Sequence, residues 1–173
     1  MRSVCGLVLA GCALLAAAQP KSDWERDNEG LLRGEDKLVL PPSPKRANLI
    51  EFEVGATAAL RYLVDAASLS VGEDGVVRYA LVARSPSGVE NVLYEGIRCA
   101  TWESKLFATG RQDGSWASRP GEWRPIVGAS AGGWQHVLGR EFFCPYGKPI
   151  RSAEEGIAAL RRGGHPVRKE RGS

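Results

Sequence analysis

The stretch Ser68–Gly110, SLSVGEDGVVRYALVARSPSGVENVLYEGIRCATWESKLFATG, decides the fold. It alternates runs of β-branched and aromatic residues with short clusters of Gly, Pro, Ser and Asp, a pattern that predicts strands joined by tight turns. Turns are expected at Gly72–Gly75, at Ser85–Gly88 and near Cys99–Trp102. Because connections this short join antiparallel neighbours, the sequence predicts a meander of about four strands.

Further elements on both sides of the meander complete the expected fold. Before it, Leu49–Val54 alternates apolar residues with glutamates, as a half-buried strand does, whereas Ala56–Asp65 fits either a helix or a strand. After it, Trp134–Phe143 has apolar residues at helical spacing, and a second helix is predicted from the capping box Ser152–Glu155 to Gly163. We therefore expect an α+β fold, with an antiparallel meander sheet of about five or six strands and two short helices near the C-terminus.

The N-terminus has the pattern of a secretory signal. Arg2 precedes an apolar run of 15 residues, Val4–Ala18, which ends in the small residues that a signal peptidase requires. Such a run is short for a membrane-spanning helix, which needs roughly 20 residues. We expect residues 1–18 to be removed and the mature protein to reside in the periplasm. Since Leu9–Cys12 also resembles a lipobox, lipidation of Cys12 and anchoring to the outer membrane is the alternative.

The expected mature chain has the size of one domain and a nearly balanced charge. Removing residues 1–18 leaves 155 of the 173 residues, and since Arg2 is one of the 23 Lys and Arg, 22 remain against 20 Asp and Glu. Nucleic acid is therefore a poor partner, since binding it needs an excess of basic residues on the folded surface. The sequence divides into a signal peptide (1–18), a polar, proline-rich leader and linker (19–47), a domain (48–166) and a basic tail (167–173).

Two of the four cysteines, Cys99 and Cys144, remain once the signal is removed. An even pair in an exported chain predicts a disulfide, because its destination is oxidising. The separation of 45 positions gives a stabilisation of about 4 kcal/mol through restriction of the unfolded chain. A redox-active pair is one alternative, although such pairs usually have C-x-x-C spacing, which this pair lacks; two unpaired thiols are the other.

Tryptophans mark a candidate binding surface in the loop-rich region after the meander. Trp116, Trp123 and Trp134 lie among Gly, Ser and Pro, with Arg124 beside them. Tryptophan and arginine are favoured where partners bind, and flat indoles also stack on sugar rings. The same tryptophans equally suit the role of fixing irregular chain to a core. The expected partner is an unknown envelope protein or a glycan.

The sequence offers little for catalysis. Its two histidines, His136 and His165, are too few for a closed zinc site, so neither a metal nor a cofactor is predicted. His136 is the candidate general base, and hydrolysis would also require a nucleophile and a group that orients the imidazole. We expect a non-catalytic binding or envelope-accessory protein, with an envelope hydrolase acting on cell-wall glycan or peptide through His136 as the alternative.

Four blocks of the sequence resemble the CNP1-like family of bacterial envelope proteins. They are DAASLSVGEDGVVRYALV (Asp65–Val82), YEGIRC (Tyr94–Cys99), FFCPYGKPI (Phe142–Ile150) and AEEGIAALRRGGHP (Ala153–Pro166). The resemblance extends over about residues 49–166 with the blocks in the family's order. It implies an exported single domain of unknown function, and it supplies no catalytic residues.

Overall fold

The computed structural model describes most of the expected mature chain. The described residues are Ser22, Arg26, 34–56, 58–118, 121–127 and 133–169. The expected signal peptide (1–18) and its alternative lipidation site, Cys12, lie outside them. Within these ranges no helix combines the length and the apolar character that crossing a bilayer requires.

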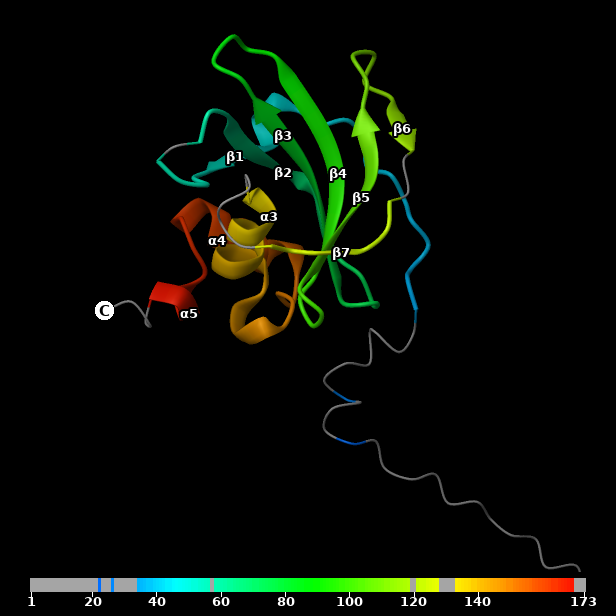
Figure 1. Cartoon of the computed structure of the whole chain (residues 1–173), viewed down its shortest axis with the longest axis vertical. Helices are drawn as coiled ribbons and strands as arrows, with labels where there is room; N and C mark the ends of the chain where they lie inside the picture. Colours follow the sequence, from blue (N-terminus) through cyan, green and yellow to red (C-terminus); the bar gives the residue numbers. More distant parts are fainter. Residues whose placement is uncertain are drawn as a thin grey trace, which may run out of the picture.

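An antiparallel sheet forms the centre of the fold (Figure 1). Strands β1 to β6 are hydrogen-bonded to one another in chain order, and a short seventh strand pairs with β5. The strands are β1 (Leu49–Phe52), β2 (Arg61–Val71), β3 (Val76–Arg84), β4 (Glu90–Arg98), β5 (Glu103–Gly110), β6 (Trp116–Ser118) and β7 (Arg124–Pro125). The predicted α+β meander is confirmed, and β3 and β5 begin and end at the residues expected from the sequence.

Strand β2 begins at Arg61, within the stretch Ala56–Asp65 that the sequence left undecided. Its pairing with β3 shifts register between Asp65 and Ser70, so one continuous strand replaces the separate segments expected from the sequence. Ser68 bridges the irregularity, because its Oγ donates to the Asp65 carbonyl at 2.7 Å and accepts from the Ala80 N–H at 2.8 Å. A hydroxyl that both donates and accepts thus supplies the link between strands where the backbone ladder is interrupted.

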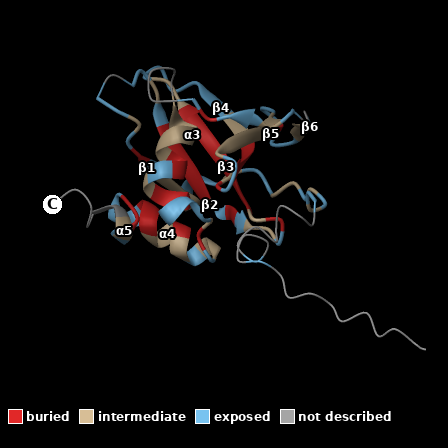
Figure 2. Ribbon diagram, turned by 60° about the horizontal axis from the view of Figure 1, so that its bottom comes forward, coloured by how far each residue is buried: buried red, intermediate tan, exposed pale blue. Residues whose placement is uncertain are grey.

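Helices cover one face of the sheet, which we call the helical face. Helix α3 (Trp134–Val137) runs directly into the π-helical segment η3 (Leu138–Phe143), so together they fill the predicted helix 134–143. The remaining helical elements are η4 (Pro145–Gly147), α4 (Ala153–Arg162) and α5 (Pro166–Lys169). Figure 2 shows buried residues concentrated on the central strands beneath them, and this core contains Tyr79, Leu81, Ile97, Leu138, Phe143 and Leu160.

Helix α4 has the ends that its sequence predicts. The Ser152 side chain accepts from the Glu155 N–H at 3.4 Å, and Gly163 ends the helix in the left-handed conformation with φ 69°. The Glu155 carboxylate, however, bonds to the Arg151 N–H and to His165 Nε2, at 2.7 and 3.0 Å. It therefore ties the helix start to the segment that follows the helix.

The opposite face of the sheet carries the N-terminal segment Gly34–Lys45. We call this segment the leader and this face of the sheet the leader face. In Figure 1 this blue segment runs beside β6 and behind the sheet before it reaches η1 (Arg46–Asn48). Leu38 and Leu40 pack against a second apolar cluster, formed by Ala80, Tyr94, Phe107 and Ala108. The proline-rich linker expected from the sequence is therefore extended, as predicted, and also packed onto the folded sheet.

Candidate functional site

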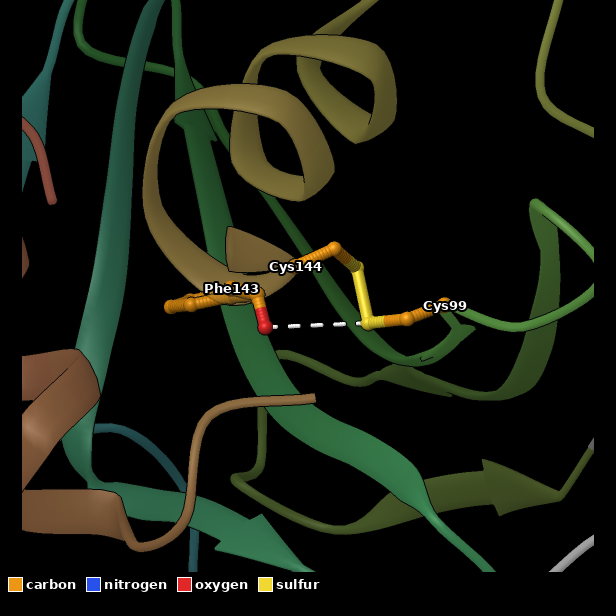
Figure 3. Close-up of a disulfide and its surroundings, with 3 residues drawn as sticks. All are labelled: Cys99, Phe143 and Cys144. Carbon is orange, nitrogen blue, oxygen red and sulfur yellow. Dashed lines mark hydrogen bonds between the residues drawn. A yellow bond between two sulfur atoms is a disulfide. The ribbon is translucent and has the colours of Figure 1, made fainter. Parts of the chain in front are cut away.

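The predicted disulfide between Cys99 and Cys144 is present, with its two Cα atoms 5.4 Å apart. It joins the end of β4 to the end of η3, and both cysteines are buried, at 5% and 6% exposure (Figure 3). The dashed line in Figure 3 marks the Phe143 carbonyl oxygen, 3.6 Å from Cys99 Sγ. This is a close packing contact, because a disulfide sulfur carries no hydrogen. A disulfide buried in this way suits a structural role, because thiol–disulfide exchange requires a sulfur that an attacking thiolate can reach.

The backbone is strained on both sides of the disulfide. Trp102 and Tyr146 both have φ 56°, a left-handed backbone conformation that residues other than glycine rarely adopt. Trp102 is held there by close packing: a Cβ on Gly139 would lie 2.9 Å from its ring. Its indole also meets the His136 ring edge-on, with centroids 5.7 Å apart. The candidate base His136 thus contacts an aromatic ring, and its buried Nδ1 has no hydrogen-bond partner among the described residues.

Two of the predicted binding tryptophans, Trp116 and Trp123, come together on the leader face. Trp116 Nε1 donates to the Pro41 carbonyl at 2.6 Å, and Trp123 Nε1 donates to Glu35 at 3.3 Å. The Arg98 guanidinium lies over the Trp123 ring, 4.0 Å from its centroid. Both half-buried indoles therefore hold the leader in place.

Trp134 lies across the sheet from this pair. It is on the helical face, stacked on Tyr62 with the ring centroids 5.4 Å apart. Arg124 lies next to Trp123 in the chain and is exposed on β7. The structure therefore brings Trp116, Trp123 and Arg124 to the β5 side of the molecule and separates Trp134 from them.

A buried glutamate, Glu95, holds Trp134 in place. Its carboxylate accepts hydrogen bonds from Trp134 Nε1 at 2.8 Å, Gln135 Nε2 at 3.1 Å and the Tyr79 hydroxyl at 3.2 Å. Burial raises the pKa of Glu95 above its ordinary value, and these three hydrogen bonds offset only part of that rise. Sequence reasoning missed this group, although its position between Leu93 and Ile97 on β4, in step with apolar residues, was a usable signal.

A second buried charge, on Asp74, lies beneath the leader. Asp74 Oδ1 accepts from Arg78 Nη1 at 3.0 Å, and the two side chains are 1% and 7% exposed. Asp74 Oδ2 also accepts from the Asp36 N–H of the leader at 3.0 Å. Burial by itself raises the pKa of Asp74, but the hydrogen bonds from Arg78, Asp36 and Val76 outweigh it and leave the pKa below its ordinary value.

An open groove of about 690 Å³ lies at the end of the leader face near the β3–β4 and β5–β6 turns. The sheet contributes Val82, Val92 and Gly110 to its lining. Three arginines from separate segments also line it: Arg46 of η1, Arg84 at the end of β3 and Arg111 after β5. We call this feature the arginine groove. Sequence reasoning missed it because its residues are far apart in the chain and meet only through the register of the sheet.

Gly110, in the lining of the groove, packs closely against β4. A Cβ at this position would lie 2.7 Å from Val92 Cβ, so any larger residue would displace the neighbouring strand's side chain. At the β5–β6 turn, Gly114 has φ 79°, a conformation that glycine adopts without strain, and lies against Ser43 of the leader. Glycines beside the groove therefore let β5 pack closely on β4 and let the β5–β6 turn approach the leader.

The described residues form an α+β fold around one sheet, with the disulfide on the helical face and the leader packed on the opposite face. The chain belongs to the CNP1-like family, whose family model matches residues 33–161. This match includes the leader and so agrees with its packing on the sheet. Comparisons with curated proteins and with solved structures found no match.

Proposed function

We propose that this CNP1-like protein is exported to the periplasm and acts there by binding, without catalysis. Export is supported by the signal pattern of residues 1–18 and by the buried Cys99–Cys144 disulfide, a bond typical of proteins in oxidising compartments. In the alternative, the protein is a lipoprotein anchored to the outer membrane through Cys12, and its folded domain would still lie in the periplasm. The intact mass of protein purified from cells distinguishes cleavage after Ala18 from lipidation.

The arginine groove is the observation that supports a binding role. Its volume of about 690 Å³ is within the range of roughly 300–1,000 Å³ typical of ligand sites. Its lining combines the accessible apolar side chains of Val89 and Val92 with charged side chains, and such sites select a ligand by apolar surface together with a few oriented polar groups. The aromatic pair Trp116 and Trp123 serves this site indirectly, because it fixes the leader that forms one side of the groove.

Photo-cross-linking in intact cells tests the binding role. A photoreactive residue at Gln112, in the groove, is expected to capture a defined envelope component, whether protein or glycan. The matched control is the same residue at Arg140, which is exposed on the helical face. Equal capture from both positions, or none from Gln112, would contradict the proposal.

Hydrolysis through His136 remains the alternative activity. A hydrolytic base needs a nucleophile or a water and a group that orients the imidazole, whereas the contact that the structure describes for His136 is the Trp102 ring. Binding is therefore the better-supported proposal. Release of fragments from purified peptidoglycan by the wild type, lost in His136→Ala, would reverse this preference.

A further inference from the structure

We propose that the arginine groove recognises oxyanion groups, phosphate or carboxylate, of a small ligand. This inference rests on the proposed binding function and names the chemistry of its ligand. It starts from the charges that line the groove: the described lining residues include three arginines and one acidic residue, Glu90.

The three guanidinium groups differ in how far they are neutralised. Arg84 is paired with Glu90, whose Oε1 lies 2.7 Å from both Arg84 Nε and Arg84 Nη2. Arg111 Nη1 lies 3.4 Å from two neutral acceptors, the Ser115 hydroxyl and the Trp116 carbonyl, and the guanidinium also interacts electrostatically with Asp113 of the same turn. Arg46 is exposed and forms no ion pair within the described part of the chain. Arg84 is therefore the arginine of the groove with a close acidic partner, whereas Arg111 interacts with Asp113 at longer range and Arg46 has no acidic partner among the described residues.

The existing contacts orient these groups. The two acceptors near Arg111 Nη1 lie within its own turn, so they restrain the side chain without satisfying its charge. The pair between Arg84 and Glu90 spans the ends of β3 and β4, which are direct partners in the sheet, so it fixes one end of the groove. Guanidinium groups bind phosphate and carboxylate with paired N–H donors, and they bind best when already oriented.

The remainder of the lining indicates a small ligand with a less polar body. Val89, which is 62% exposed, and the half-buried Val92 offer apolar contact in the groove. A polyanion such as nucleic acid would need a continuous basic surface, whereas the chain as a whole has a formal charge of only +3. A ligand with two oxyanion groups joined by a short neutral segment fits this arrangement.

Calorimetric titration at low ionic strength tests the inference, with inorganic pyrophosphate and citrate as separate probes. Wild-type protein is expected to bind at least one of them, and Arg46→Gln/Arg111→Gln is expected to weaken that binding by ten-fold or more. The control variant, Arg140→Gln/Arg161→Gln, removes two exposed arginines from the helical side and is expected to bind as the wild type does. Pyrophosphate binding alone would assign the ligand to phosphates, and citrate binding alone to carboxylates.

Amide NMR shifts of the wild type provide a second readout that does not depend on variant folding. Either probe is expected to shift the amides of Gly88, Gly110 and Gly114, and to leave that of Gly163 on α4 unchanged. Equal weakening in both double variants, shifts spread over the surface, or no binding of either probe would overturn the inference. Capture at Gln112 in cells without binding of either probe would refute the anion chemistry and leave the binding function in place.

Discussion

Asp74 and Arg78 form a buried ion pair beneath the leader, and its energetics follow from the two side chains being almost inaccessible to water. Removing one partner of a buried pair leaves the other charge unpaired in a medium that solvates it poorly. We expect Asp74→Ala to lower the free energy of unfolding by about 3–5 kcal/mol, measured by urea denaturation. Glu51→Ala, which breaks the exposed pair with Arg61, is the control and should cost far less because water screens that pair.

The same pair gives a pH dependence with a definite sign. Because the pKa of Asp74 is lowered in the folded state, its contribution is complete above its ordinary pKa of 3.8 and is lost as the pH falls through the folded value. The difference in unfolding free energy between wild type and Asp74→Ala should therefore shrink on acidification below that pH. A difference that grows on acidification would contradict the assigned pairing.

The contribution of Glu95 to stability has the opposite pH dependence to that of Asp74, because burial without a neighbouring cation raises the pKa of Glu95. Its stabilising contribution is complete below its ordinary pKa of 4.5 and declines as the pH rises through the folded value. We expect Glu95→Gln, which keeps an acceptor for Trp134 Nε1, to gain stability relative to the wild type as the pH rises from about 4 to 8. Urea unfolding at several pH values measures this gain, and a constant difference would show that the folded pKa of Glu95 is unshifted.

Residue-level chemistry was predictable from the sequence only where counting or local spacing determines it. The pairing of Cys99 with Cys144 was predicted from the expected export and from the number of cysteines that the expected cleavage leaves. Glu95 and Asp74 were not predicted, because their roles depend on partners such as Trp134 and Asp36, which lie 39 and 38 positions away. The arginine groove was missed for the same reason.

Among the elements, those specified by local patterns were predicted and those specified by docking were not. Helix α4 was predicted because Ser152 and Gly163 signal its two ends, and β3 because turn residues flank it. The packing of the leader was not, because prolines at Pro41–Pro44 predict extended chain without indicating what it contacts.

The leader provides its own test through the alternation Leu38-Val39-Leu40. Leu38 and Leu40 face the sheet, whereas Val39 is 74% exposed. We expect Leu38→Ala/Leu40→Ala to detach the leader and to accelerate tryptic cleavage after Lys37 and Lys45, because a bound extended segment resists proteolysis. Val39→Ala is the matched control and should be cleaved at the wild-type rate. Equal cleavage rates in all three proteins would show that these leucines do not hold the leader.

At the scale of the whole molecule, the two faces of the sheet are closed by different means. The leader face is covered by a segment that precedes the sheet, held by the apolar contacts of Leu38 and Leu40 and by polar contacts such as the pair of Glu35 with Lys105 at 2.8 Å. The helical face is held by the apolar core and by the disulfide, which fixes the end of η3 to the end of β4. The arginine groove opens on the face without the covalent link, so ligand binding there can depend on the leader while the core stays intact.

The disulfide therefore determines the stability of the molecule more than the shape of the groove. The bond closes a loop of 45 positions, and its removal is expected to lower the free energy of unfolding by about 4 kcal/mol, since the unfolded chain regains the freedom that the loop restricts. Cys99→Ala/Cys144→Ala should accordingly unfold at lower urea than the oxidised wild type, and a reductant should bring the wild type towards the variant while leaving the variant unchanged. Under conditions in which the variant remains folded, it should still bind whichever oxyanion probe the wild type binds. A reductant that leaves the wild-type transition unaltered would show that the bond does not stabilise the fold, and loss of probe binding in the folded variant would show that the two faces are coupled.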